Sequence, residues 1–183
     1  MLSIRKYEEK DFKNAQYICL NSDEGEMSEE LCEFLLHVFC DYYIEHEPDN
    51  CFVLDDGGRA VGYIICAEDY DTYKEIFDRD YLPLIKHCSD DLYQWGLVST
   101  VLQNKYKADY PAHLHIDLLP QYQHQGWGGK LMNALFEHLK KKGVRGVILS
   151  TGIDNVNAGK FYKKLGFKEI EILGTEVAFG IKL

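Results

Sequence analysis

Apolar and polar residues alternate in several short segments of this chain, which predicts β-strands. The opening strand is expected at residues 2–7. Residues 51–67 are expected to form a hairpin that turns at Asp56-Gly57-Gly58. The remaining strands are expected at residues 113–119, 146–151, 168–174 and 175–183, the last two as a pair.

Apolar residues that recur every three or four positions predict helices between these strands. We expect helices at residues 9–20, 28–46, 130–143 and 153–167, with Ser28 as the N-cap of the second and Gly166 ending the last. Residues 68–112 are rich in Tyr, Asp and Leu, and the stretches EDYDTYKEIF and DYLPLIKHC within them have a partly helical pattern. They are expected to form one or two helices and a long connection, inserted into a single domain of residues 1–183.

The most informative segment is HLHIDLLPQYQHQGWGG, in which a strand and a proline lead through three glycines into a helix. The turn reads Gln123-x-x-Gly126-x-Gly128-Gly129. Such a turn leaves several backbone N–H groups unpaired at the positive end of a helix, which suits a phosphate or pyrophosphate. A Cβ at the glycines would hinder the approach of a phosphate oxygen. The alternative is a tight turn whose glycines serve geometry alone; the order of strand, proline, glycines and helix favours the anion site.

Two familiar glycine loops do not fit this turn. A Walker loop requires Ser or Thr after its lysine, whereas Leu131 follows Lys130. A dinucleotide fingerprint requires a third glycine at position 131 and an early strand–helix–strand unit, whereas this turn lies two-thirds along the chain.

Composition narrows the choice of partners only modestly. The net charge of −10 argues against nucleic acid, because phosphate contacts need clustered Lys and Arg. Surplus acid could favour a cationic substrate, although solubility alone explains it more simply. No apolar run approaches the ~20 residues of a membrane span, and the N-terminus turns acidic too early for a signal peptide, so we expect a cytoplasmic protein without a membrane partner. The six cysteines form no CxxC pair and are expected to be structural.

Two motifs together resemble the GNAT family of N-acetyltransferases. LLPQYQHQGWGGKLM is similar to the family's Gln/Arg-x-x-Gly-x-Gly/Ala turn, and NVNAGKFYKKLGF is similar to its Asn-x-x-x-x-Phe-Tyr-x-x-x-Gly-Phe segment. In addition, YPAHLHIDLLPQYQ resembles bacterial acetyltransferases related to the C-terminal region of O-GlcNAc hydrolases, a region often regarded as non-catalytic. The resemblance implies an α/β (α+β) fold: a mixed, mostly antiparallel sheet with helices on both faces and a splay between its fourth and fifth strands.

The resemblance also implies a mechanism. Acetyl-CoA would be the donor and a primary amine the acceptor, with the pantetheine arm in the splay and the pyrophosphate on the N–H groups near residues 124–129. Tyr162 would stand near the thioester sulfur and protonate the departing thiolate, although a helix-face aromatic could equally pack in the core. By resemblance, acetyl-CoA is assigned to Leu118, Leu119, Gln123, His124, Gln125, Gly126, Trp127, Gly128, Gly129, Lys130, Asn155 and Tyr162.

Polar residues on one face of the fourth strand are candidates for the general base. His113, His115, Asp117 and Leu119 alternate with Leu114, Ile116 and Leu118, which we expect in the core. Asp117 could orient His115 and raise its basicity, and either could take a proton from the acceptor ammonium directly or through water. The alternatives are structural: Asp117 bonded to backbone, and His115 a half-buried ring. A metal site on His-x-His-x-Asp is possible chemically, but amine acetylation needs no metal, so none is expected.

The acceptor pocket is expected between the loop at 21–30, the insert and the final hairpin. Asp23, Glu24, Glu26 and Glu29 could receive a cation, although a solvated acidic loop is the simpler interpretation. In the same way, Tyr70, Tyr73 and Trp95 could line a pocket or pack the insert down. The rival hypothesis to an enzyme is a non-catalytic acyl-CoA-binding or protein-interaction module on this fold. Family members are often dimers, which raises a homodimer as an expectation.

Overall fold

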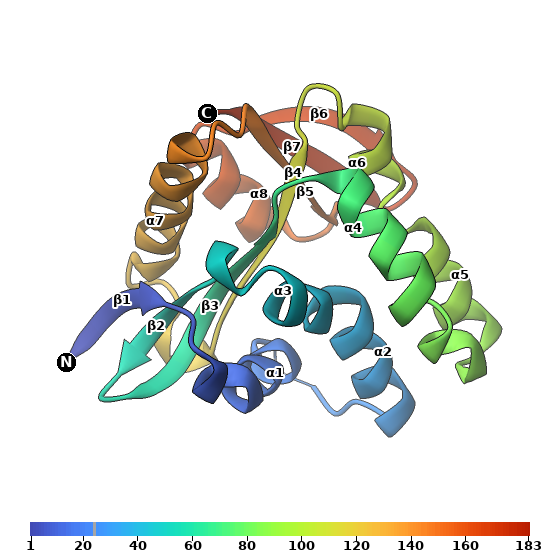
Figure 1. Ribbon diagram of the computed structural model, residues 1–183, viewed down its shortest axis with the longest axis horizontal. Helices are drawn as coiled ribbons and strands as arrows, with labels where there is room; N and C mark the ends of the chain where they lie inside the picture. The colour runs from blue at the N-terminus through green and yellow to red at the C-terminus, as the bar shows by residue number, and fades with distance from the viewer. Residues whose placement is uncertain (24) are drawn as a thin grey trace.

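A seven-stranded mixed sheet in the order β1-β2-β3-β4-β5-β7-β6 runs through the molecule (Figure 1). The computed structural model describes residues 1–23 and 25–183. The strands are β1 (Leu2–Lys6), β2 (Phe52–Asp56), β3 (Arg59–Ala67), β4 (Ala112–Leu118), β5 (Gly146–Gly152), β6 (Lys168–Leu173) and β7 (Glu176–Lys182). The helices are α1 (Phe12–Asn21), α2 (Glu29–Phe39), α3 (Asp41–His46), α4 (Tyr70–Ile76), α5 (Asp90–Val98), α6 (Val101–Tyr106), α7 (Trp127–Lys141) and α8 (Val156–Lys164).

The sheet opens between β4 and β5, as expected. These two strands are parallel, and within the described residues they pair only at Ala112–Val147 and His113–Ile148. Each has a fully paired antiparallel neighbour on its other side: β3 for β4, and β7 for β5. The four N-terminal strands and the three C-terminal strands are therefore joined at one end and diverge toward the other.

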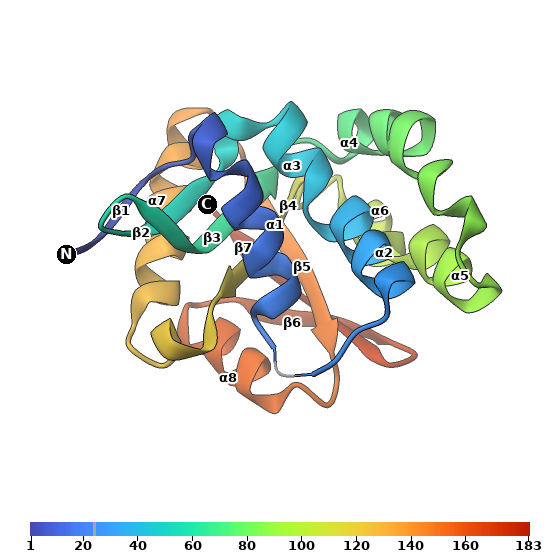
Figure 2. The ribbon, with the colours of Figure 1, turned by 90° about the horizontal axis from the view of Figure 1, so that it is seen from below.

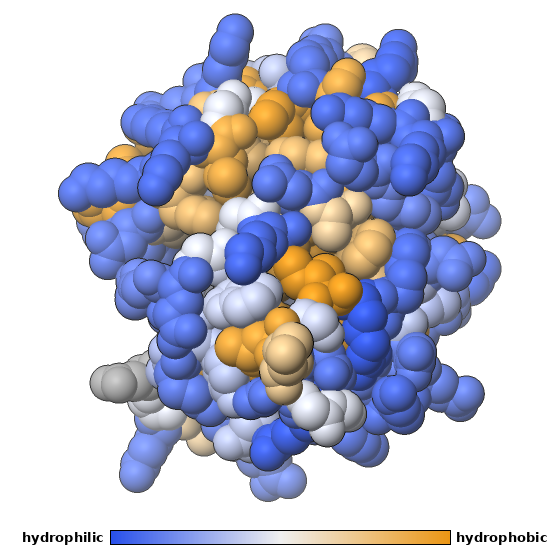
Figure 3. Space-filling view, turned by 90° about the vertical axis from the view of Figure 1, so that its left-hand side faces the viewer, coloured by the Kyte–Doolittle hydropathy of each residue, from blue (hydrophilic) through white to orange (hydrophobic). Residues whose placement is uncertain are grey.

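Helices cover both faces of the sheet (Figures 1 and 2). The helices α7 and α8 lie on one face, and α1 to α6 lie on the other. Helix α7 turns an apolar side to the sheet, where Leu131, Met132, Leu135 and Leu139 are buried. On the side that carries α7 and β1, hydrophilic side chains surround apolar ones gathered toward the middle (Figure 3). Among the helices of the described residues, none is long and apolar enough to cross a membrane.

The helix predicted from Ser28 to His46 is interrupted, so that prediction was wrong in one respect. Ser28 does cap α2, accepting a hydrogen bond from the Leu31 N–H at 3.2 Å. At Cys40 the backbone leaves the helical region (φ −132°, ψ −61°), and α3 begins at the next residue. The break has a packing reason: four consecutive residues, Asp41 to Ile44, are buried. A continuous helix would turn some of them to solvent.

The insert at 68–112 is more helical than predicted. Besides α4, α5 and α6 it contains a π-helical turn at Phe77–Tyr81 and a 3₁₀ turn at Leu84–His87. One side of this run is buried against α3 and β4 through Tyr70, Tyr73, Phe77, Tyr81 and Ile85. Packed aromatic rings, rather than a long connection, therefore account for this segment.

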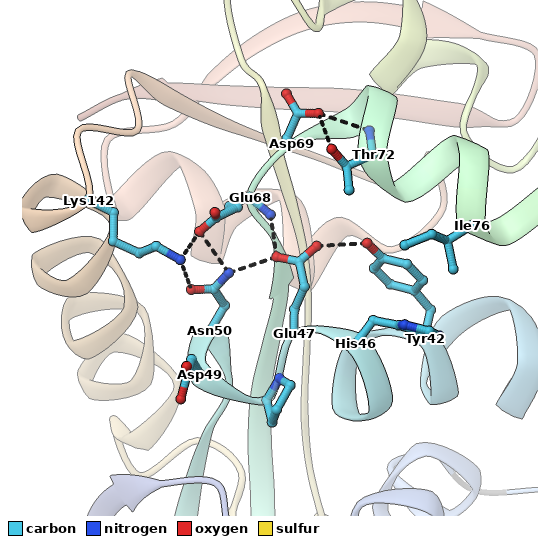
Figure 4. A pocket seen from close by; sticks show the side chains of 11 residues that line it. Tyr42, His46, Glu47, Asp49, Asn50, Glu68, Asp69, Thr72, Ile76 and Lys142 are labelled. Atoms are coloured by element: carbon cyan, nitrogen blue, oxygen red, sulfur yellow. Dashed lines mark hydrogen bonds and ion pairs between the residues drawn. The ribbon is translucent and has the colours of Figure 1, made fainter.

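A small polar pocket of about 300 Å³ lies where α3, β3, α4 and the end of α7 meet (Figure 4). The Glu47 carboxylate accepts hydrogen bonds from the Tyr42 hydroxyl (2.8 Å), the Asn50 amide (2.7 Å) and the Glu68 N–H (2.9 Å). Lys142 pairs with Glu68 and donates to the Asn50 side-chain oxygen at 3.1 Å. These bonds tie the start of the β2–β3 hairpin to two helix ends.

Candidate functional site

A groove of about 810 Å³ occupies the opening between β4 and β5. Its walls are β4 from Leu114 onward, the turn that leads into α7, the middle of β5, and one side of α8. Because β4 and β5 stop pairing after His113 and Ile148, polar backbone of both strands faces this space. An extended ligand can therefore lie between the strands and bond to them.

The glycine turn closes one end of the groove with backbone donors. Gly126 is the N-cap of α7 and has a left-handed backbone (φ +83°). His124 is also left-handed (φ +59°). Within the described residues, the N–H groups of 124–126 make no backbone hydrogen bond, and the first N–H groups of α7 have no acceptor inside the helix. This cradle of donors at the positive end of α7 fits a diphosphate.

The three glycines of the turn serve different purposes. A Cβ at Gly126 would meet no described atom within 4 Å, so that the space a phosphate needs is open there. A Cβ at Gly128 would lie 3.1 Å from the Phe161 ring of α8, and at Gly129 3.8 Å from Leu165. Access for phosphate therefore does not explain Gly128; close packing of α7 on α8 does.

Several residues assigned to acetyl-CoA by resemblance offer no free side chain to the groove. The Gln123 amide donates to the carbonyls of Ser22 and Leu118, both at 2.8 Å, and so ties the turn to α1 and β4. Leu118 lines the groove, whereas Leu119 is buried beneath it. On the outside of the turn, the Gln125 amide donates to Gln121, and the Lys130 ammonium lies 3.7 Å from the centre of the Trp127 ring.

The second motif forms the opposite wall. Asn155 caps α8, its side-chain oxygen accepting a hydrogen bond from the Ala158 N–H at 3.1 Å. Tyr162 lines the groove and packs on the rings of Phe161, Phe167 and Phe179. Burial, and then the nearby Asp117 carboxylate, raise the pKa of Tyr162 above its ordinary value. The hydroxyl is therefore protonated at neutral pH.

Asp117 lines the groove from β4 and is held by a tyrosine. The Tyr63 hydroxyl, on the neighbouring strand β3, donates to Asp117 Oδ2 at 2.6 Å. Burial raises the pKa of Asp117 to about 6, against the lowering effect of this bond. Asp117 thus titrates close to neutral pH, the range in which a carboxylate can both accept and release a proton.

Neither strand histidine bonds to Asp117 within the described residues, so the expectation that Asp117 orients His115 was wrong. His115 Nε2 lies 3.0 Å from the Tyr43 hydroxyl of α3, and burial lowers the pKa of His115 to about 4. His113 is buried among aromatic rings, and neither ring nitrogen has a partner within the described residues. Burial, with a smaller effect of His115, lowers its pKa to about 3. Both rings are neutral at pH 7, and the three side chains do not converge as ligands of one ion would.

Of the residues expected to form an acceptor pocket, the structure places one at the groove and several elsewhere. Asp23 lines the groove, whereas Glu24 lies outside the described residues. Glu26 and Glu29 are exposed, as the solvated-loop alternative predicted. Tyr70 and Tyr73 are buried packing residues, while Trp95, 40% exposed, stacks on α2.

The comparison with family models agrees with this geometry. Residues 14–167 match the Acetyltransferase (GNAT) family. The chain belongs to this family. Its sheet, with the parallel β4–β5 pair inside an otherwise antiparallel order, is the mixed GNAT fold.

Named acetyltransferases and solved structures are similar to this family member. An uncharacterised N-acetyltransferase of Methanocaldococcus jannaschii is 27% identical over 133 residues, covering 72% of this chain and 45% of that protein. N-alpha-acetyltransferase 30 of Schizosaccharomyces pombe is 24% identical over 126 residues, covering 69% and 62%. The chain thus spans about half the length of these curated relatives.

Among solved structures, SsHAT is 29% identical, with a TM-score of 0.87 over 99% of this chain and 98% of that one. The PaiA N-acetyltransferase of Thermoplasma acidophilum, crystallised with coenzyme A, shares the fold at 18% identity, with a TM-score of 0.64 over 100% and 99% of the two chains.

Some residues in the groove, or bonded to it, gave no local sequence signal. Tyr63 reaches Asp117 only through the β3–β4 register, which pairs the two residues. Ser22 and Lys164 also line the groove, from the end of α1 and the end of α8. Ser150, in the predicted strand 146–151, could have been found by applying the period of two to that strand.

Proposed function

We propose that this GNAT-family protein transfers the acetyl group of acetyl-CoA to a primary amine by direct attack. The observation that carries the proposal is the shared groove: the donor-rich turn before α7, the unpaired β4 and β5 backbone, Asp117 and Tyr162 all border one space. The assigned residues would hold the diphosphate on the 124–129 backbone and the pantetheine arm along β4 near Leu118. The ligand would supply an activated thioester.

In this proposal, two groove residues each carry out one of the proton transfers that the reaction needs. Asp117, with its pKa of about 6, takes a proton from the acceptor ammonium, so that the neutral nitrogen can bond to the acetyl carbon. As the carbon–sulfur bond breaks, the Tyr162 hydroxyl gives its proton to the sulfur, and the second proton that the nitrogen loses as the amide forms returns to the Tyr162 oxygen. His115, neutral and next to Asp117 along the face of β4, is the second candidate for the base. A cytoplasmic location and a homodimer stay predictions from the sequence.

A non-catalytic acyl-CoA-binding module is the second candidate. Gln123 favours it, because its amide is engaged within the protein rather than directed to a ligand. The segment that resembles O-GlcNAc hydrolases points the same way.

Two measurements on the purified chain separate these candidates. We expect acetyl-CoA at 100 times its Kd to stabilise the protein by about 2.7 kcal/mol. We then expect thiol release with some members of a panel of amines and amino-terminal peptides. No stabilisation at millimolar acetyl-CoA would contradict both candidates, and stabilisation without thiol release would favour the module.

A further inference from the structure

Glu176, at the start of β7, is a half-buried carboxylate on the acceptor side of the sheet. Ala178, two residues further along the strand, packs with Leu102 of α6. Since side chains alternate along a strand, Glu176 faces the same side, which is also the side of His115 and Asp117. Ser150, which lines the groove, is close enough to act on the Glu176 carboxyl by hydrogen bonding.

Glu176 and Asp117 lie at the same level across the splay. The β4–β5 register pairs His113 with Ile148, and continuing it brings Asp117 level with Gly152. Gly152 pairs directly with Glu176 on the other side. A Cβ at Gly152 would meet no described atom within 4 Å, so that the strip between the two carboxylates is open. Because β5 lies between β4 and β7, two strand spacings of about 4.8 Å separate Asp117 from Glu176. Their Cα atoms are therefore at least about 10 Å apart.

The contrast with Glu171 shows that the charge of Glu176 is not balanced. Glu171 faces the same side from β6, where it pairs with Ala178. Its carboxylate accepts from the Lys105 ammonium and the Tyr106 hydroxyl, each at 2.6 Å. Within the described residues, Glu176 has no ion pair, and burial raises its pKa. A partly desolvated carboxylate without a cation is stabilised when one arrives.

We propose that Glu176 binds a second cationic group of the acceptor, which makes the acceptor a small linear diamine. This inference rests on the proposed function. One amine lies beside Asp117 and the groove, the unbranched chain crosses the open strip above Gly152, and the far ammonium meets Glu176. Glu176 is thus a specificity-determining residue rather than a catalytic one.

The test compares unbranched α,ω-diamines with monoamines of the same chain length, by thiol release from acetyl-CoA. We expect kcat/KM for the best diamine to exceed that for its matched monoamine at least about tenfold, as one charge-assisted contact provides. Glu176→Gln should raise KM for the diamine and remove its advantage over the monoamine. Glu171→Gln is the matched control: it neutralises a glutamate on the same face and should keep the advantage.

Other outcomes overturn the inference. Equal kcat/KM for diamine and monoamine, or an advantage that survives Glu176→Gln, would show that Glu176 does not select the acceptor. Turnover of lysine-containing peptides but not of free diamines would overturn the assignment of a small acceptor. Thermal stabilisation by acetyl-CoA reports on the proposed function separately. Stabilisation with turnover but without diamine selectivity would contradict this inference alone, and absent stabilisation would contradict the proposed function.

Discussion

At the scale of single residues, Asp117 combines two opposed properties. Its carboxyl is desolvated beside the groove, which raises its pKa to about 6 and makes the charged form costly at neutral pH. Tyr63 offsets part of this cost by donating a hydrogen bond. A carboxyl of this kind suits the proposed role of Asp117 as a base near neutral pH, and its desolvation reduces the stability of the fold.

Asp117→Asn should therefore lose activity and gain stability. We expect kcat/KM to fall about 100-fold, because the proposed base is lost. The free energy of unfolding at pH 7 should rise by about 2 kcal/mol, since the folded pKa of about 6 exceeds the unfolded value near 3.8. The folded state holds the proton more tightly, so this gain should shrink as pH falls through 6 and vanish below about 4. Urea unfolding at pH 7 and pH 4 measures it; a variant that is destabilised at both would contradict the assigned shift.

Tyr162→Phe tests the proposed role of Tyr162 as a proton donor. Removing the hydroxyl should lower kcat by about 100-fold and change the Kd for acetyl-CoA less than about threefold, because the ring still packs on Phe167 and Phe179. Tyr106→Phe, which removes a hydroxyl outside the groove, is the control. Isothermal titration calorimetry measures the Kd, and steady-state kinetics measures kcat. An unchanged kcat would show that Tyr162 is not the proton donor.

The candidate site shows how far single residues can be predicted from sequence. Asn155 as a helix cap, and Asp117 and Tyr162 beside one space, follow from motif order and strand alternation. The hydrogen-bond partners of Asp117 and His115 could not be predicted in this way. Tyr63, which bonds to Asp117, comes from β3, 54 residues away, and Tyr43, which bonds to His115, comes from α3, 72 residues away. Neighbours at i and i+2 on a strand share a face, but each can find a better partner on another element.

At the scale of elements, the crossing of α7 over α8 depends on one glycine. Gly128→Ala would place a Cβ 3.1 Å from the Phe161 ring, so that the ring must give way by a few tenths of an ångström. We expect a loss of about 1–2 kcal/mol in the free energy of unfolding, together with weaker acetyl-CoA binding, since α8 carries Asn155 and Tyr162.

Gly129→Ala is the matched control for this prediction. Its Cβ would make only ordinary contact, 3.8 Å from Leu165. Alanine is the better helix former by about 1 kcal/mol, so stability should be kept or raised. Chemical denaturation of both variants is the measurement. Equal losses would show that the turn, rather than the contact with Phe161, is sensitive.

Element boundaries were predictable where periodicity was strong. The hairpin, α7, α8 and the last two strands follow from it. The break at Cys40 could not be predicted from periodicity, because no Gly or Pro marks it. Its cause is the burial of four consecutive residues, Asp41 to Ile44. In the insert, Tyr70, Tyr73, Phe77, Tyr81 and Ile85 recur every three or four residues. That spacing predicts a continuous buried side, and counting it would have found the helices.

At the scale of the whole molecule, two buried neutral histidines make the fold sensitive to acid. The pKa values of His113 and His115, about 3 and about 4, lie below the unfolded value near 6.5. Unfolding below pH 6.5 therefore takes up protons, and stability should fall as pH decreases, by up to about 1.4 kcal/mol per unit for each ring. Asp117 opposes this trend below pH 6.

His113→Phe isolates one of these contributions. Between pH 6.5 and pH 4.5, we plot the free energy of unfolding against pH for the parent protein and for the variant. The slope of the variant should be smaller by up to about 1.4 kcal/mol per pH unit. The slope is the readout because the substitution also changes packing, which shifts the stability at every pH alike. Parallel slopes would show that His113 charges readily in the folded state.

The global arrangement was the part best predicted from the sequence. Two motifs at a fixed separation, together with the order of elements, were enough for the sheet, its splay and the glycine turn. What they could not supply is the identity of the acceptor, because the segments expected to form its pocket, which are the loop at 21–30, the insert and the final hairpin, contain no motif.

The divergence of β4 and β5 also bears on how firmly the two ends of the chain hold together. Two residue pairs are all the sheet hydrogen bonding that links β5, β7 and β6 to the rest within the described residues. A ligand that bonds to both inner edges acts as a missing strand, and opening of the C-terminal half must then break its contacts as well. The lifetime of the closed molecule, and with it resistance to proteases, becomes a function of ligand concentration. When the ligand concentration falls, we expect proteases to reach the C-terminal half before any other part of the sheet.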